Sequence, residues 1–216
     1  MIFPTLDIEI KLWESGYSYV CGLDEVGRGC FAGPVVVGAV VFPKDVVLPE
    51  GIADSKLLKP QTRERLAEEI KKVALGWSIA EISVRDINNM GIGKATQKAF
   101  RKAVISVKPK PDFVVFDAFY NLNVVKIASS AYIKHLTRKR QQAVKDGDKI
   151  CASISAASII AKVYRDKLMV NLHQKYPYYG FAKHKGYGTK AHQEAIKKHG
   201  LCRIHRKSFS LGKFLT

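Results

Sequence analysis

The chain has 216 residues, 47% of them hydrophobic, and carries 36 lysines and arginines against 19 acidic residues, a formal net charge of +17. This length suits one sizeable core, and the hydrophobic fraction excludes a chain that is mainly disordered. Such a surplus of positive charge costs self-repulsion, which is most simply explained by a polyanionic partner, and nucleic acid is the first candidate. Residues 1–60 hold eight acids and five bases, a net −3, so the rest of the chain holds +20. A metal–carboxylate site approached by a basic binding surface would have this distribution.

The predicted elements alternate between strands and helices. Segments rich in β-branched residues predict strands over 18–24 and 34–42, and the Gly-rich stretch 27–33 between them favours an antiparallel pair. A third strand is predicted over 77–83. The segment 111–117 is apolar and bounded by proline, which is typical of a buried central strand. These strands predict an α/β fold.

Apolar residues at helical spacing predict helices over 60–74, 94–107 and 153–175, and a short final helix over 189–199. The segment 121–149 is left open. Its lysines and arginines fit a solvated helix face or a nucleic-acid contact equally well.

No linker rich in Gly, Ser or Pro divides the chain, so we expect one domain over residues 1–216, with a basic helical segment from about 182 to 216 packed on it. Charged residues interrupt the N-terminus before an export signal can form, and the longest uncharged apolar run, 31–43, is too short to span a bilayer. We expect a cytoplasmic protein with no membrane partner. Its four cysteines lack C-x-x-C spacing, which favours reduced thiols over zinc or disulfides.

The stretch Asp24-Glu25-Val26-Gly27-Arg28-Gly29 follows the first predicted strand. Adjacent carboxylates on a regular strand point to opposite faces, so Asp24 and Glu25 can share one metal ion only if the strand ends or bulges there. The glycines supply such a turn and leave backbone N–H groups open to a phosphate or a sugar. In a strongly basic protein, this acidic pair fits a hard-cation site for phosphate chemistry, although a solvated surface pair is the plainer interpretation.

Two more carboxylates could complete that site. Asp117 ends the apolar strand FVVFD, where burial would be costly unless the acid were paired or metal-bound. Its alternative role is to cap a loop. Asp148 precedes the long helix and is either a fourth ligand or simply an acid at a helix N-terminus.

Several motifs together resemble those of bacterial ribonuclease HII. They run in order from about residue 18 to residue 209 and are, in this sequence, DEVGRG at 24–29, ADSKLL at 53–58, the strand ending in Asp117, Gly147-Asp148, ISAASIIAKVYRD at 154–166 and HKGYGTKAH at 184–192. The resemblance implies a ribonuclease H-like fold, a mixed five-stranded sheet flanked by helices. It also implies hydrolysis of the RNA strand of RNA–DNA hybrids and cleavage at a single ribonucleotide within duplex DNA.

By position, the resemblance implies Asp24, Glu25, Asp117 and Asp148 as catalytic metal ligands for Mg²⁺ or Mn²⁺, with two ions during catalysis leaving 5′-phosphate and 3′-hydroxyl ends. It implies Gly27, Arg28 and Gly29 as the loop that senses the ribose 2′-hydroxyl, the group that distinguishes RNA from DNA. Tyr187 matches the tyrosine that packs on the sugar at the RNA–DNA junction. Lys56, His184 and Lys185 fall in motifs expected near the nucleic-acid backbone.

The chain departs from the family in two places. Ala118 stands where a glycine is common, and the interval from Asp117 to Asp148 is longer than in most bacterial members, which leaves Asp146 as a substitute for Asp148. The DEVGRG motif makes the related ribonuclease HIII a weaker match.

Tyr187 lies between Gly186 and Gly188, which would hold its ring clear of the protein body and favour contact with a ligand over a plain surface position. The histidines of the C-terminal third lack the i, i+4 spacing of a helical metal site. We therefore interpret them as polar or phosphate-facing groups: His184, His192, His199 and His205.

Two other functions compete with this one. A non-catalytic nucleic-acid-binding protein would explain the charge equally well, but it would not need acids clustered at strand ends. A nucleotide-binding enzyme is less consistent, because the glycines at 27, 29 and 33 are spaced one residue too far apart for a dinucleotide fingerprint. We expect a monomer, and the sequence does not decide whether a replication clamp recruits it.

Overall fold

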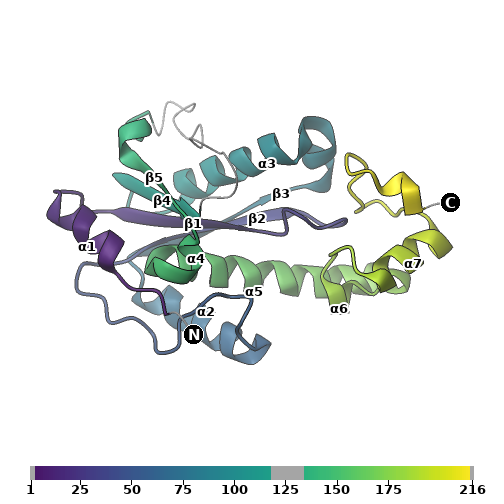
Figure 1. Ribbon diagram of the computed structural model, residues 1–216, viewed down its shortest axis with the longest axis horizontal. Helices are drawn as coiled ribbons and strands as arrows, with labels where there is room; N and C mark the ends of the chain where they lie inside the picture. Colours follow the sequence, from purple (N-terminus) through teal and green to yellow (C-terminus); the bar gives the residue numbers. More distant parts are fainter. Residues whose placement is uncertain (1–2, 118–133, 215–216) are drawn as a thin grey trace.

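A mixed five-stranded sheet forms the centre of the protein in the computed structural model, which describes residues 3–117 and 134–214 (Figure 1). The strand order is β3-β2-β1-β4-β5. The first three strands of the chain pair antiparallel, whereas β1 pairs with β4, and β4 with β5, in parallel. The predicted mixed sheet and the antiparallel pairing of its first two strands are therefore confirmed. The strands are β1 (Val20–Val26), β2 (Val35–Val41), β3 (Gly76–Ile82), β4 (Phe113–Asp117) and β5 (Gln141–Val144).

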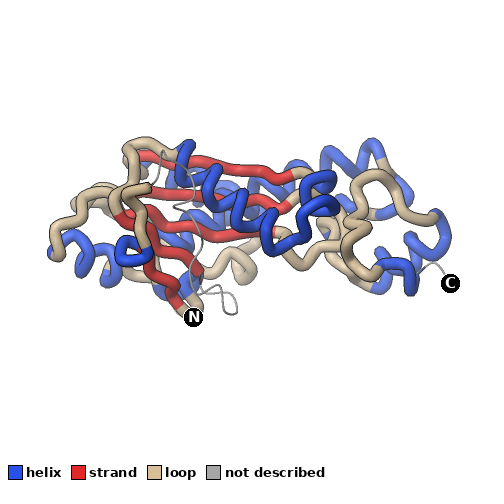
Figure 2. Tube along the Cα trace, turned by 90° about the horizontal axis from the view of Figure 1, so that it is seen from above, coloured by secondary structure: helices blue, strands red, loops and turns tan. Residues whose placement is uncertain are grey.

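Helices cover both faces of the sheet. Helix α3 lies along one face and α5 along the other, with α2 packed on α5 (Figures 1 and 2). Helices α6 and α7 lie beyond the end of the sheet, near the C-terminal half of α5 (Figure 1). The helices are α1 (Asp7–Glu14), α2 (Pro60–Val73), α3 (Val84–Ser106), α4 (Gly147–Ile150), α5 (Ala152–Lys175), α6 (Phe181–His184) and α7 (Lys190–His199).

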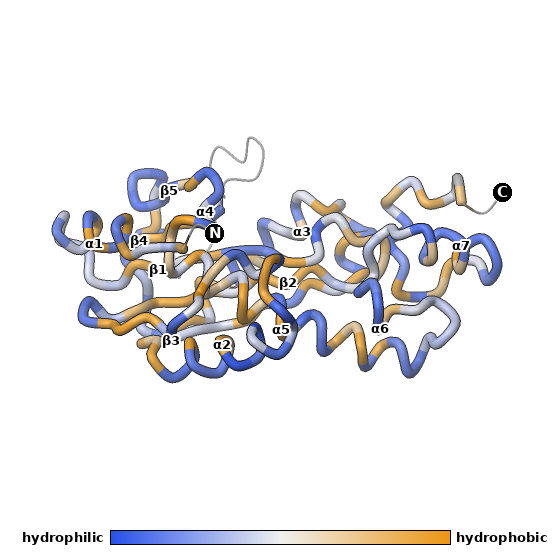
Figure 3. The backbone as a smooth tube through the Cα atoms, turned by 60° about the horizontal axis from the view of Figure 1, so that its bottom comes forward, coloured by the Kyte–Doolittle hydropathy of each residue, from blue (hydrophilic) through white to orange (hydrophobic). Residues whose placement is uncertain are grey.

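The alternation of side chains along β1 and β2 divides the core in two. Leu23 and Val37 belong to the cluster under α3, whereas Val40 packs with α2 and α5. On the α5 face, a Cβ added to Gly22 or Gly38 would lie 2.2 Å from the backbone of α5. The absence of side chains at these positions lets the helix rest directly on the sheet. Figure 3 shows the strands coloured mostly as hydrophobic, with alternating colours along α5.

The helix predicted over 94–107 begins ten residues earlier. Ser83 caps its N-terminus, accepting a hydrogen bond from the backbone N–H of Asp86 at 3.1 Å. Gly91 interrupts the helix with φ 79°, which breaks the regular apolar spacing and hides the first two turns from a periodicity argument. The other predicted helices agree with the structure within two residues.

Four short elements were not predicted: α1, α4, α6 and β5, each of eight residues or fewer. Such short segments contain too few turns or alternations to produce a periodic pattern. Part of the basic segment 121–149 lies outside the described residues, which resume at 134. None of the helices in the described ranges is both long and apolar enough to cross a membrane.

Candidate active site

A groove of about 1060 Å³ opens at the end of β1. Its walls come from the strand ends, the Gly-rich loop after β1, the loop before α2, the middle of α5 and the segment joining α6 to α7. All but one of the site residues predicted from the sequence line it: Asp24, Glu25, Gly27, Arg28, Gly29, Lys56, Asp117, His184, Lys185 and Tyr187. The exception is Asp148, which is buried beside the groove and is reached through Lys56.

Asp24 and Glu25 lie within a regular part of β1. The strand neither ends nor bulges at them, because pairing with β2 continues through Val26. The two carboxylates therefore point to opposite faces: Asp24 lies on the α5 side, with Ser158 as a hydrogen-bond partner, and Glu25 on the α3 side. The turn expected from the glycines comes only after Val26. Both acids still reach one groove, because β1 runs past its neighbour β4, whose pairing ends at Leu23.

Asp117 and Asp148 are held near Asp24 by backbone and lysine contacts. Asp117 ends β4, and its Oδ1 accepts a hydrogen bond from the N–H of Gly147 at 2.7 Å. Asp148 lies in the first turn of α4 with 3% of its surface exposed, and its Oδ2 accepts a hydrogen bond from Lys56 Nζ at 2.8 Å. Asp146 instead lies in the solvent-exposed pair with Lys149, at 2.6 Å. The structure thus buries Asp148 against Lys56 and leaves Asp146 exposed to solvent.

Burial and mutual repulsion disfavour the charged forms of these acids. Burial, then the charge of Glu25, raises the pKa of Asp24 well above its usual value. Burial also raises the pKa of Glu25 to about 7, although the nearby Arg28 opposes the shift. The pKa of Asp117 is raised by burial and by Asp148, against the hydrogen bond from Gly147. Partial burial of Lys56 is outweighed by its contact with Asp148, so the pKa of this lysine is raised. A positive charge placed near these acids would therefore stabilise their charged forms.

The donor set suits a hard divalent cation, since it consists of carboxylate oxygens that repel one another. The ammonium group of Lys56 already contacts one of these carboxylates, that of Asp148. Within residues 3–117 and 134–214, however, no three of the acids, histidines or cysteines are grouped closely enough to form the shell of one ion. The opposite orientation of Asp24 and Glu25 contributes to this spread.

Three of the predicted substrate contacts line the groove from α6 and the segment between α6 and α7: His184, Lys185 and Tyr187. Tyr187 is 41% exposed, and its ring lies near the Nζ of Lys162, 5.7 Å from the ring centroid. Lys185 has φ 51° and its Nζ donates to the carbonyl of Ala182. His184 uses both ring nitrogens internally: Nε2 contacts the carbonyl of Tyr179 at 2.6 Å, and Nδ1 accepts from the N–H of Gly186.

For two of the other histidines, the phosphate-facing alternative is wrong. His192 and His205 are fully buried and face each other, with 3.1 Å between their Nε2 atoms. The contacts of the outer nitrogens define the tautomers. His205 Nδ1 accepts from the N–H of Cys202, so its Nε2 donates to His192, whose Nδ1 in turn donates to the carbonyl of Tyr187. They support the segment 185–189 between α6 and α7, which we call the Tyr187 segment, and they cannot contact phosphate.

Sequence reasoning placed several groove residues on α5 and near the C-terminus outside the site. Lys162 and Asp166 form an i, i+4 ion pair at 2.7 Å, and Ser158 lies beside Asp24. The i, i+4 spacing of Lys162 and Asp166 was a usable signal, whereas nothing in the sequence marks Phe209 as a groove residue.

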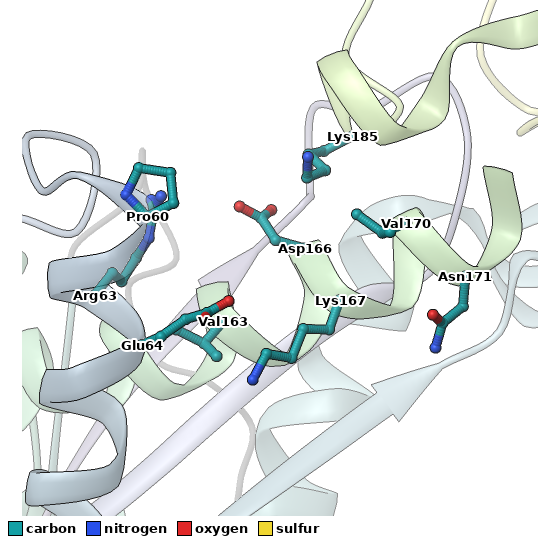
Figure 4. Close-up of a pocket in the computed structure, with 9 residues that line it drawn as sticks. All are labelled: Pro60, Arg63, Glu64, Val163, Asp166, Lys167, Val170, Asn171 and Lys185. Carbon is teal, nitrogen blue, oxygen red and sulfur yellow. The ribbon is translucent and has the colours of Figure 1, made fainter.

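A smaller hollow of about 460 Å³ adjoins the groove between α2 and α5. Pro60, Arg63, Asp166 and Lys185 line both spaces. Figure 4 shows Pro60 and Arg63 projecting from α2 opposite Asp166 on α5. Its lining carries acids as well as bases, so the hollow extends the groove without forming a separate anion site.

The sheet order, the helices on its two faces and the acids at the ends of β1 and β4 define an α/β protein of the ribonuclease H-like fold. The solved ribonuclease H2 of Pyrococcus horikoshii OT3 aligns with a TM-score of 0.75 and 28% identity, over 90% of this chain and 95% of that one. The structure of a PCNA:RNase HII complex from Archaeoglobus fulgidus aligns with a TM-score of 0.73 and 26% identity, over 87% and 92% of the two chains.

The sequence model of the Ribonuclease HII family matches residues 21–211. A ribonuclease HII of Alkaliphilus oremlandii is 42% identical over 98% of this chain and 100% of its own length. The chain belongs to the ribonuclease HII family. It is a ribonuclease H, a hydrolase of the endonuclease type.

Proposed function

We propose that the protein hydrolyses the RNA strand of RNA–DNA hybrids, and that it also cuts at single ribonucleotides embedded in duplex DNA. The observation that carries the proposal is that one groove contains both the acids of β1 and β4 and the Gly-Arg-Gly loop with Tyr187. A site for phosphodiester chemistry therefore adjoins a backbone that can sense a ribose hydroxyl. The duplex itself would be held by the +20 surplus outside the first 60 residues, part of which lines the groove as Lys162, Lys183 and Lys185, together with Lys56 from the first 60 residues.

In this mechanism Asp24, Glu25, Asp117 and Asp148 would hold Mg²⁺ or Mn²⁺, with two ions during catalysis. When bound, these ions would supply an activated water and stabilise charge on the phosphate and on the leaving 3′-oxygen, which gives 5′-phosphate and 3′-hydroxyl ends. Asp148 would exchange its contact with Lys56 for the cation, which frees this ammonium for the nucleic-acid backbone.

The specificity for ribonucleotides would come from the loop. Gly27, Arg28 and Gly29 line the groove next to the acids, and a 2′-hydroxyl at this position would distinguish a ribose from a deoxyribose. Tyr187, which also lines the groove, would pack against the sugar that follows. We expect a monomer to carry out the hydrolysis, because no step requires a second subunit.

The test uses two duplexes, one with a single internal ribonucleotide and one RNA–DNA hybrid, each incubated with Mg²⁺, Mn²⁺ or EDTA. The wild type should cut both in the presence of metal and leave ligatable 5′-phosphates, and Asp24→Asn should cut neither. Asp45→Asn, at an exposed position outside the groove, is the matched control and should behave as wild type. An intact ribonucleotide strand with the wild type, or a fully active Asp24→Asn, would refute the proposal.

A second readout tests the basic surface. The logarithm of hybrid affinity should fall with the logarithm of salt concentration, with a slope of roughly −0.7 to −0.9 per phosphate contact. A flat salt response would mean that the basic residues do not hold the duplex.

A further inference from the structure

Two arginines lie completely buried beneath the Gly-rich loop at residues 27–34. Arg165 on α5 and Arg206 near the C-terminus each expose 0% of their surface, and neither forms an ion pair with a carboxylate in the part of the chain that the structure describes. Burying a charge without an ionic partner is costly unless its donors are all used. We refer to this pair as the arginine brace.

Backbone carbonyls of the loop take the place of the missing carboxylates. Arg206 donates to four of them, at 2.6 to 3.0 Å: those of Gly27, Arg28, Gly33 and Pro34. Arg165 donates to the carbonyls of Ala32, Pro34 and Lys185. The brace therefore ties the loop to α5 on one side and to the Tyr187 segment on the other.

The contacts of Arg206 fix the orientation of two peptide planes. The C=O and N–H of a trans peptide point in opposite directions, so carbonyls turned inward onto the guanidinium turn the next N–H groups outward. The carbonyls of Gly27 and Arg28 are held in this way, so the outward groups are the N–H of Arg28 and of Gly29.

The surroundings of the glycines agree with this orientation. A Cβ added to Gly27 would lie 2.0 Å from Arg165 Nε, so this glycine faces the packed side of the loop. A Cβ added to Gly29 would meet nothing within 4 Å, so this residue faces open space in the groove. Gly27 also has φ 86°, which L side chains rarely adopt.

We infer that Arg206 is a positioning residue: it sets the two outward N–H groups of the Gly-Arg-Gly loop so that they meet the ribose, without itself contacting the substrate. This inference rests on the proposed function, in which the loop senses the 2′-hydroxyl. A lysine at this position would keep the charge but cannot reach four carbonyls with a planar fork. Burial lowers the pKa of Arg206 to about 10, so the group stays charged at neutral pH.

The experiment compares Arg206→Lys with the control Arg203→Lys, an exposed arginine three residues earlier. Per folded molecule, Arg206→Lys should lose about 100-fold in kcat/KM on the single-ribonucleotide duplex, as expected for a misplaced contact. Its Mn²⁺ affinity by calorimetry and its affinity for an all-DNA duplex should stay at the wild-type values. Arg203→Lys should be unchanged in all three. Full activity of folded Arg206→Lys would overturn the inference, as would a parallel loss of Mn²⁺ and all-DNA binding.

A measurement on the wild type keeps the inference falsifiable if Arg206→Lys does not fold. In ¹⁵N spectra recorded with EDTA, the amides of Arg28 and Gly29 should respond more to a duplex with one ribonucleotide than to the all-DNA duplex of the same sequence. Equal responses to the two duplexes would overturn the inference. Wild type that fails to cut refutes the proposed function instead, and the amide responses still decide whether these groups meet the ribose.

Discussion

The carboxylates of the groove and the arginine brace bury opposite charges at the same end of the molecule, but in different ways. The guanidinium groups of Arg165 and Arg206 have three or four carbonyl partners each. The acids have few donors and repel one another, and burial raises the pKa of Asp24 and Glu25. Charges that are fully hydrogen-bonded stabilise one loop conformation, whereas charges left in mutual repulsion favour a bound cation.

Removing the charge of one groove carboxylate should have the largest effect on activity. Asp24→Asn should lower kcat/KM more than about 1000-fold, because a ligand that stabilises the transition state is lost. The same change relieves repulsion, so the free energy of unfolding without metal should rise by about 1 kcal/mol. Urea titration with EDTA measures this, with Asp45→Asn as control. A less stable but active Asp24→Asn would show that the acids are structural, like the brace.

Acid should destabilise the buried histidine pair that supports the Tyr187 segment. Burial lowers the pKa of His192 and of His205 to about 4. Below the usual value of 6.5 the unfolded chain takes up protons that the folded chain does not, so stability should fall as the pH decreases from about 6.5 to about 4. NMR titration of the ring signals, with exposed His199 as reference, measures both values. Titration of the buried pair near 6.5 would contradict the hydrogen-bonded neutral pair.

Lys56 tests the link between Asp148 and its cationic partner. Lys56→Met leaves the buried Asp148 without its partner, which should cost about 1 kcal/mol in the absence of metal, since the lysine itself is exposed. Mn²⁺ should restore the lost stability by taking the position of the ammonium. Melting temperatures with EDTA and with Mn²⁺ provide the comparison, and Lys59→Met, at an exposed neighbouring position, is the control. An equal loss under both conditions would separate Lys56 from the metal site.

A surface ion pair that lies outside both the acidic groove and the arginine brace should have the smallest effect on stability. Arg65 and Glu69 form an i, i+4 ion pair on α2 at 2.7 Å, in which Arg65 is exposed and Glu69 is partly exposed. Glu69→Gln should change the free energy of unfolding by about 0.5 kcal/mol or less. A larger change would mean that surface ion pairs, and not buried groups, dominate the electrostatics of this fold.

The strands and long helices were predictable because each has its own repeating pattern. The run PVVVGAVVF predicts β2, and the apolar spacing of 60–74 predicts α2. The start of α3 was missed because Gly91 breaks the pattern, and β5 because four residues contain too little of one. The site was anticipated to the extent that its residues lie in contiguous motifs, such as Asp24 to Gly29.

The sequence by itself determined four of the five strands, the motifs and the unequal distribution of charge, because these depend on neighbours along the chain. Only the tertiary structure decided that Asp24 and Glu25 point to opposite faces, that Asp148 is buried while Asp146 is exposed, and that His192 and His205 are buried. It also decided the role of Arg206, a residue 179 positions from Gly27, whose carbonyl it holds. Contacts at such separation leave no local pattern, because they form only when the fold brings the two segments together.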